Sequence, residues 1–169
     1  MKSDFVIVDP SEHDVYDIVL TLRANRNDPS MFLRSPGDIS RNLKDFIISK
    51  DINGRIIGCA ALHQYNPALG EILSVAVLPE FQGQGVGNHL IENRIRQADL
   101  KGIQQTWLAT VKPVYFGRFG FTPFSRWKLP VSVLIHKLNQ VFQQPLRRWS
   151  PAIFGKFTFM ERHTETRIS

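Results

Sequence analysis

The stretch Gly70–Gly87 reads GEILSVAVLPEFQGQGVG and decides the fold of the chain. Residues 71–78 are an apolar run that opens with one acidic residue and is interrupted only by Ser74. The valines and the length of this run favour a buried strand over a helix. Pro79 ends the strand, because proline has no N–H to donate to the hydrogen-bond ladder.

A glycine-rich loop follows the strand and consists of Gln82, Gly83, Gln84, Gly85, Val86 and Gly87. Alternate glycines leave successive backbone N–H groups unshielded, and the helical pattern over 88–100 adds the free N–H groups and positive dipole end of a helix start. Such a loop can bind a diphosphate or another anion with little help from Lys or Arg. A flexible turn is the alternative interpretation of the glycines alone.

The spacing of these glycines separates the loop from two other nucleotide-binding loops. A P-loop requires Gly-Lys-Ser/Thr, and the dinucleotide-binding fingerprint places its last two glycines three apart after the first strand of a fold. The order Gln-x-x-Gly-x-Gly after a strand ending in Val-x-Pro instead resembles the acetyl-CoA loop of the GCN5-related N-acetyltransferase (GNAT) superfamily.

The chain is most similar to small stand-alone amino-acid acetyltransferases related to N-acetylglutamate synthase. The resemblance covers residues 4–124 and is specific over 54–121, where GCAALH, GEILSVAVLPEFQGQGVG and YFGRFGF occur in the family's order. It implies a GNAT-like fold in which a central sheet splays to admit acetyl-CoA.

Length and composition indicate one globular domain. The chain has 169 residues, of which 43% are apolar and 21% are charged, so we expect residues 1–169 to form a single N-acetyltransferase domain. One cysteine, Cys59, argues against a disulfide or a multi-cysteine metal site and fits a reducing compartment. Because no long apolar run is present at the N-terminus, we expect a cytoplasmic protein with no membrane partner.

The net charge of +6 is concentrated toward the C-terminus. Nine of the 21 Lys and Arg residues lie between Arg118 and Arg167, where only Glu161 and Glu165 oppose them. This basic segment could contact nucleic acid or a polyanionic cofactor, or it could be a solvated face. Since no nucleic-acid-binding motif accompanies the charge, we expect no nucleic-acid partner.

Hydrophobic patterning predicts a mixed α/β (α+β) fold with a mostly antiparallel, splayed sheet flanked by helices. Strands are predicted over 5–8, 46–49, 55–63, 71–78, 104–110, 121–124 and 157–161. Helices are predicted over 12–24, 36–43, 88–100 and 112–119. Asn53-Gly54 predicts a tight hairpin and 65–70 a second connection, so the central strands form a meander. Strand 104–110 follows a strand and a helix, and it should pair parallel to 71–78 or splay beside it.

Residues 129–154 depart from the simple hairpin that usually closes the family's fold. Apolar residues recur at a helical period from Leu129 to Phe142, and Pro145 and Pro151 break the segment that follows. We therefore expect a helical insertion over 129–154, followed by a last strand that pairs back into the sheet.

The resemblance also implies how acetyl-CoA is held as co-substrate. Backbone groups of Val75 and Val77 would bond the pantetheine arm, while the N–H groups of 82–87 would bind the diphosphate. If the sheet splays here, the freed backbone groups of 71–78 need partners, which pantetheine amides can supply. By resemblance the N–H of Val75 is also the oxyanion donor. The side chains of both valines are most simply explained by core packing.

Glu71 is the candidate general base, acting through a water molecule. Without a gap to the glycine-rich loop, it matches the position of the catalytic glutamate in part of the family. A carboxylate at the mouth of an apolar strand is partly desolvated, which suits a proton acceptor. A solvated glutamate without a role is the alternative. His63 is the competing base, since an imidazole accepts protons near neutrality, although a lone histidine at a strand end can be structural.

Tyr115 is the candidate general acid. Many members carry a tyrosine five residues before the Gly-Phe that ends the short helix, where this chain has Phe116. One step along a helix turns a side chain by about 100°. Either Tyr115 protonates the thiolate through an altered turn, or no side-chain acid is used, because a thiol with a pKa of about 8.5 leaves readily. Cys59 lies within a strand pattern, and we expect a buried, inert thiol and direct transfer.

The sequence therefore predicts an acetyl-CoA-dependent N-acetyltransferase that acts on a primary amine of a small molecule in a ternary complex. An amino acid is the first candidate, on the resemblance alone. The alternatives are acetylation of protein lysines or N-termini and a non-catalytic acyl-CoA-binding regulatory module. A homodimer is possible, because a second copy could cover an exposed edge strand.

Overall fold

The computed structural model describes residues 4–29, 31–142 and 157–164. They form one seven-stranded sheet with the order β1-β2-β3-β4-β5-β7-β6. The strands are β1 (Phe5–Val8), β2 (Phe46–Asp51), β3 (Ile56–Asn66), β4 (Leu69–Val77), β5 (Gln105–Thr110), β6 (Thr122–Pro123) and β7 (Thr158–His163). The helices are α1 (Val15–Ala24), α2 (Pro36–Arg41), α3 (Val86–Leu100), α4 (Pro113–Gly117) and α5 (Val131–Phe142), with 3₁₀ turns at Glu12–Asp14, Leu43–Asp45, Pro79–Phe81 and Arg126–Lys128.

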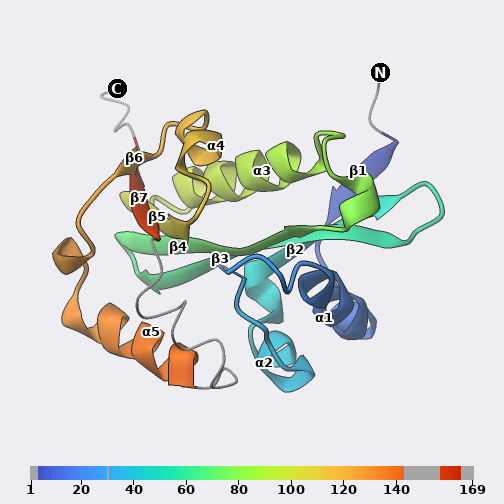
Figure 1. The fold of residues 1–169 in the computed structure, drawn as a ribbon, viewed down its shortest axis with the longest axis horizontal. Helices are drawn as coiled ribbons and strands as arrows, with labels where there is room; N and C mark the ends of the chain where they lie inside the picture. The colour runs from blue at the N-terminus through green and yellow to red at the C-terminus, as the bar shows by residue number, and fades with distance from the viewer. Residues whose placement is uncertain (1–3, 30, 143–156, 165–169) are drawn as a thin grey trace.

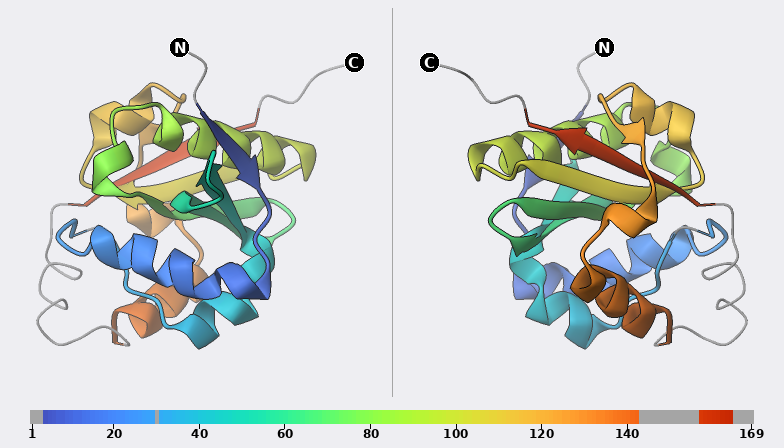
Figure 2. Two further views of the ribbon diagram at one scale, coloured as in Figure 1. Left: turned by 90° about the vertical axis from the view of Figure 1, so that its right-hand side faces the viewer. Right: turned by 90° about the vertical axis from the view of Figure 1, so that its left-hand side faces the viewer.

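Helices cover both faces of the sheet. In Figure 1, α3 and α4 lie above the sheet, whereas α1, α2 and α5 lie below it, and the end-on views of Figure 2 show the same layers. Every described strand pair is antiparallel except β4 with β5. The predicted mixed, mostly antiparallel fold is confirmed. No helix in the described part of the chain is long and apolar enough to cross a membrane.

Apolar stripes on α1 and α3 hold these layers together. The residues that α1 buries at one-face spacing are Val15, Ile18, Val19 and Leu22. Those that α3 buries against the other face are Val86, Leu90, Ile91 and Ala98. Burying each large apolar side chain contributes roughly 1.5–3 kcal/mol before the entropy cost of ordering it. The two helices therefore clamp the central strands β3 and β4 between them.

The structure corrects several predicted boundaries by a few residues, and two of these corrections concern β4 and α3. Residues 65–70 were expected to form a connection, but β3 runs to Asn66 and β4 starts at Leu69. Leu69 is buried with Trp107, so cross-strand packing outweighs the local turn signal. Helix α3 begins at Val86 instead of residue 88, because the Val86 side chain is buried against the sheet.

The helical insertion is confirmed for the part that the structure describes. Helix α5 spans Val131–Phe142, and the last strand, β7, pairs with β5 and β6. Residues 143–154 of the predicted insertion lie outside the described residues. That residues 1–169 make a single domain stays a prediction.

Two irregularities open the sheet beside β4. Ser74 has a φ of 54°, a left-handed conformation that non-glycine residues rarely adopt. The register of β3 with β4 shifts there, so that Ser74 and Val75 together oppose one residue of β3. Strands β4 and β5 pair only from Leu69 to Glu71, and no described pair joins them beyond Glu71. This divergence confirms the predicted splay.

Candidate active site

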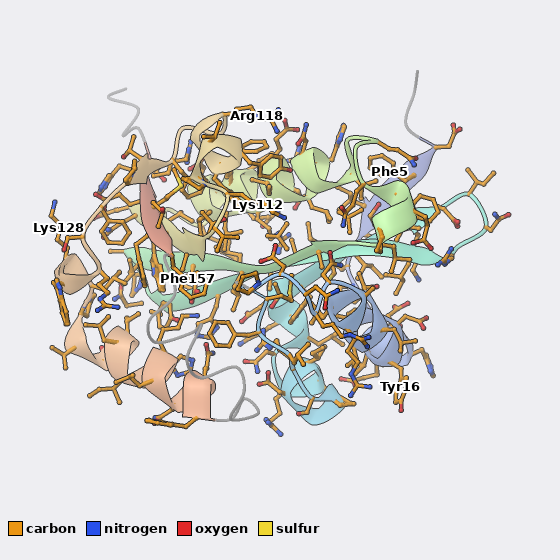
Figure 3. All side chains as sticks on the ribbon, in the orientation of Figure 1. Phe5, Tyr16, Lys112, Arg118, Lys128 and Phe157 are labelled. Carbon is orange, nitrogen blue, oxygen red and sulfur yellow. The ribbon has the colours of Figure 1, made fainter. Side chains whose placement is uncertain are left out.

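A cavity of about 790 Å³ joins the gap between β4 and β5 to the glycine-rich loop. Its volume is typical of sites for small molecules, which span about 300–1,000 Å³. The predicted site residues that line it are Glu71, Val75, Val77, Gln82, Gly83, Gly85, Gly87 and Tyr115. Lys112, Arg118 and Phe157 also line the cavity, with Phe157 on the side of α5 (Figure 3). The structure thus brings the predicted cofactor loop and the predicted base into one space.

The glycine-rich loop has the conformation that anion binding requires. Gly83 and Gly85 have φ values of 78° and 87°, where a side chain is strained. Gly85 directly precedes α3, so its neighbours present free N–H groups at the positive end of a 15-residue helix. The Gln82 amide donates to the Val77 carbonyl at 3.1 Å and to Asn25 Oδ1 at 3.2 Å, which fixes the loop to the end of β4.

Gln84 and Val86 differ from the other loop residues, because their side chains do not line the described cavity. Gln84 is exposed and donates to the Glu80 carbonyl at 3.0 Å, while Val86 is 1% exposed in the core. A cofactor role for these two residues is thus left to their backbone groups. Val75 and Val77 also pack in the core, as expected of their side chains.

Glu71 is buried, with 3% of its surface exposed, so the solvated alternative is excluded. Its Oε2 accepts a hydrogen bond from the Tyr65 hydroxyl at 2.6 Å. Its Oε1 lies 2.5 Å from Nζ of Lys137, which comes from α5. Burial, and then the charge of Glu71, raises the pKa of Tyr65, so its hydroxyl keeps the proton that it donates.

His63, the competing base, is engaged elsewhere. Its Nδ1 lies 2.7 Å from Asp45 Oδ2, and it is absent from the described lining of the cavity. The ring of His136 stacks on it at a centroid distance of 5.9 Å. Burial, followed by the neighbouring Lys137 and His63, lowers the pKa of His136. His136 lines the cavity in place of His63.

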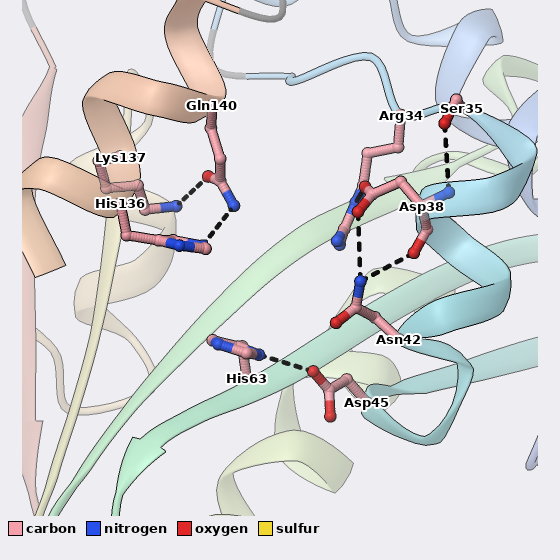
Figure 4. Close-up of polar contacts among 9 residues, drawn as sticks. All are labelled: Arg34, Ser35, Asp38, Asn42, Asp45, His63, His136, Lys137 and Gln140. Carbon is pink, nitrogen blue, oxygen red and sulfur yellow. Dashed lines mark hydrogen bonds and ion pairs between the residues drawn. The ribbon is translucent and has the colours of Figure 1, made fainter.

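Helix α5 thus contributes polar side chains that the sequence did not reveal. His136, Lys137 and Gln140 project from α5 toward the side where Arg34 and Asp38 lie (Figure 4). Lys137 donates to Gln140 Oε1 at 3.1 Å, and Gln140 Nε2 lies 3.0 Å from His136 Nε2. Their only sequence signal was the break from the family's usual hairpin.

Arg34 also lines the cavity, from the segment between α1 and α2. Its Nε pairs with Asp38 Oδ2 at 2.5 Å, and Asn42 in turn donates to Asp38. The turn-rich sequence around Arg34 does not single out this residue as one that lines the cavity.

Tyr115 reaches the cavity although Phe116 holds the family's tyrosine position. Its hydroxyl donates to Asn88 Oδ1 at 2.9 Å, and a Cβ on Gly87 would lie 3.0 Å from that hydroxyl. Burial raises the pKa of Tyr115, so its hydroxyl stays protonated at neutral pH. Phe116 lines the cavity as well but packs on Phe121. The one-residue step therefore places the hydroxyl beside the start of α3.

Cys59 is fully buried, and burial raises the pKa of its thiol to about 12. The thiol contacts the Ser74 carbonyl at 3.5 Å. A thiolate is therefore scarce at neutral pH, and Cys59 is the inert side chain that the strand pattern predicted.

Comparison with known protein families shows to which family a chain with this cavity and glycine-rich loop belongs. The model of the acetyltransferase (GNAT) family matches residues 13–121, more than half of the chain. The chain belongs to the GNAT family. GNAT enzymes use acetyl-CoA as co-substrate, so the predicted family and the predicted cofactor are both confirmed.

Two relatives illustrate the range of this GNAT chain's similarity. An uncharacterized N-acetyltransferase of Chlorobaculum tepidum is 31% identical over 103 residues, which are 61% of this chain and 66% of the relative. An amino-acid acetyltransferase of Mycobacterium tuberculosis is 36% identical over 72 residues, which are 43% of this chain and 41% of the relative. The matches thus span about two thirds of the first relative's length and less than half of the second's.

Solved structures share the GNAT fold along nearly the whole chain. Rv2747 from Mycobacterium tuberculosis, crystallised with CoA and NLQ, has a TM-score of 0.76 at 21% identity and covers 94% of this chain and 98% of that one. N-acetylglutamate synthase from Neisseria gonorrhoeae, crystallised with coenzyme A and N-acetyl-glutamate, has a TM-score of 0.76 at 22% identity. It covers 97% of this chain and 36% of that one.

Proposed function

We propose that this GNAT protein transfers the acetyl group of acetyl-CoA directly to a primary amine of a small molecule, with an amino acid as the first candidate. One observation carries the proposal. The cavity that starts at the glycine-rich loop extends past the gap between β4 and β5 to the buried carboxylate of Glu71. A diphosphate site, a slot for the pantetheine arm and a proton acceptor then follow one another in the order that acetyl transfer needs.

In this proposal the loop N–H groups of 82–87 bind the diphosphate, and backbone groups of Val75 and Val77 bind the pantetheine arm. The thioester would then lie at the bulge of β4, where the chain turns at Ser74. The N–H of Val75 would stabilise the oxyanion of the tetrahedral intermediate, a contribution worth several kcal/mol in other acyl transfers.

Glu71 would accept the proton of the acceptor ammonium, directly or through water, while the Tyr65 hydroxyl holds the carboxylate in place. The neutral amine then attacks the thioester carbon, and CoA leaves as the thiolate. Tyr115 would protonate that thiolate, because its raised pKa keeps the phenol in its neutral, protonated form at neutral pH. Transfer from thioester to amine in one ternary complex needs no enzyme thiol, which agrees with the burial of Cys59.

Charge in the cavity supports an acceptor that carries a carboxylate. Arg34 and Lys137 both line the cavity, where Arg34 pairs with Asp38 and Lys137 with Glu71. An ammonium at Glu71 together with a carboxylate near Arg34 would be complementary to this arrangement, and amino acids carry both groups. The name of the Mycobacterium tuberculosis relative, an amino-acid acetyltransferase, points the same way.

The test begins with thermal unfolding in the presence of acetyl-CoA. At 100 times Kd, binding adds about 2.7 kcal/mol of stability, which for a chain of this size raises Tm by roughly 5–10 °C. CoA release is then measured with the free amino acids, polyamines and lysine peptides as acceptors. Turnover of a free amino acid supports the proposal. Faster acetylation of peptides would favour a protein acetyltransferase, and binding without any turnover would favour the regulatory module.

Glu71→Gln separates catalysis from binding, because it removes the proton acceptor and keeps the shape of the side chain. Turnover should fall on the order of 10²-fold or more, while the rise of Tm with acetyl-CoA persists. Unchanged turnover in this variant would reject Glu71 as the base.

We further propose that the protein acts in the cytoplasm and can form a homodimer. Strand β1 is an edge of the sheet, and it leaves Val6 and Val8 exposed. A second copy pairing there would cover these side chains. Analytical ultracentrifugation tests this, with Val6→Lys as the variant that should dissociate the dimer; a monomer at all concentrations would refute it.

A further inference from the structure

Lys137 places a primary amine of the protein itself against the candidate base. Its Nζ lies 2.5 Å from Glu71 Oε1, and the two side chains are 19% and 4% exposed. Lys137 belongs to α5, which lies outside residues 13–121 that match the family model. This contact is therefore a property of the chain's own C-terminal part.

The surroundings hold Nζ inside the cavity. It lies 5.5 Å from the ring centroid of Trp107 and 5.8 Å from that of Phe32, within the range of cation–π attraction. It also donates to Gln140 Oε1 at 3.1 Å. An aromatic wall, a neutral acceptor and a buried carboxylate are the features that a pocket for a substrate ammonium would need.

We propose that Lys137 is an internal acceptor, which the protein acetylates at Nζ from bound acetyl-CoA when no external amine occupies the cavity. The inference rests on the proposed function. An external ammonium must reach Glu71 to lose its proton, and in this structure Lys137 takes that place.

The reaction is an ordinary acetyl transfer with a protein amine. Glu71 accepts one proton from the Lys137 ammonium, and the lone pair of Nζ attacks the thioester carbonyl carbon. The C–N bond forms and the C–S bond breaks, and the second proton of the attacking nitrogen passes to the departing CoA thiolate, directly or through water, so the products are a neutral N-acetyl-lysine and the CoA thiol. The bulge at Ser74 lies three residues, or roughly 10 Å, along β4 from Glu71. Nζ must therefore move along the cavity, which the flexible four-carbon stem of lysine permits.

Acetylation would change the site, because an N-acetyl-lysine carries no charge. Glu71 would lose its cationic partner, and each chain could react only once. An external amine that binds at Glu71 would displace Lys137 and slow the modification. Self-acetylation is thus a single-turnover side path of the same site.

The experiment uses the full chain and acetyl-CoA without any added amine. Intact-mass and peptide mass spectrometry should find one acetyl group per chain, at Lys137. Exposed Lys44 and Lys101 serve as internal references for chemical acetylation. Glu71→Gln should slow labelling of Lys137 at least tenfold and leave the two references unchanged. Lys137→Arg, which keeps a cation beside Glu71, should abolish the specific label.

Unfolding the wild-type chain in urea provides a second measurement that depends on no variant. The preference for Lys137 over Lys44 and Lys101 should vanish, because it comes from the folded site. Absence of label at Lys137 in a protein that acetyl-CoA stabilises would overturn the inference and leave the proposed function intact. A label that is equally fast in Glu71→Gln or in urea would also overturn it. No stabilisation by acetyl-CoA would instead refute the proposed function.

Discussion

The pairing of Glu71 with Lys137 can be measured as a coupling free energy. Removing one partner of a buried ion pair typically costs about 3–5 kcal/mol, because the other charge stays buried alone. Here Lys137 is 19% exposed and borders a cavity that water can enter, and Tyr65 still bonds Glu71. For Lys137→Met we therefore expect a lower loss, about 2 kcal/mol, which corresponds to a fall in Tm of roughly 4–8 °C.

A double-mutant cycle measures this coupling. It compares the free energies of unfolding in urea of the wild type, Lys137→Met, Glu71→Gln and the double variant. The double variant should be less destabilised than the sum of the single variants, with a coupling of about 1–2 kcal/mol. Arg55→Met is the matched control, since the Arg55–Glu80 pair has a similar distance of 2.7 Å but is more than half exposed, and its loss should leave Tm nearly unchanged. If the single effects add to within about 0.5 kcal/mol, the ion pair does not form in solution, and Lys137 does not hold the position beside Glu71 from which it would be acetylated.

Four further outcomes follow from the structure. Gly85→Ala, at a φ of 87°, should lower the free energy of unfolding by about 1–2 kcal/mol and weaken acetyl-CoA binding. Gly54→Ala, at a φ of 79° in the β2–β3 turn, is the control: it should lower the free energy of unfolding in urea by as much and leave acetyl-CoA titrations unchanged. Tyr115→Phe should lower kcat on the order of 10²-fold without changing acetyl-CoA affinity; an unchanged kcat would mean that no side-chain acid is used. Iodoacetamide should alkylate Cys59 only after unfolding, because its pKa is about 12, and rapid alkylation of the native chain would contradict its burial. Burial lowers the pKa of His136 below its ordinary 6.5, so as the pH falls the unfolded state binds the proton before the folded state does. The free energy of unfolding should therefore decrease as the pH drops through 6.5, and His136→Gln should flatten that part of the stability profile. A profile that is the same in His136→Gln would show that His136 titrates alike in both states.

Local sequence determined β4, the glycine-rich loop and α3. The apolar run ending at Pro79, the alternate glycines and the helix behind them are contiguous, and each follows from backbone chemistry within a few residues. The antiparallel meander, the crossover to β5 and the return of β7 were predictable for the same reason, since period and turn signals act locally. Predicted strand boundaries were wrong by a few residues where packing between strands sets the boundary. Leu69 is an example, because its burial beside Trp107 extends β4 toward the N-terminus.

The acceptor end of the site was decided by tertiary structure alone. Glu71 was visible as an acidic residue at the mouth of a strand, but its contacts with Tyr65 and Lys137 were not. Nine Lys and Arg residues lie between Arg118 and Arg167, and nothing in the sequence singles out Lys137 as the one whose ammonium meets Glu71. Which cation meets the carboxylate depends on where α5 packs against the sheet. That position is fixed by many weak contacts between distant parts of the chain, each too small to leave a pattern in the sequence.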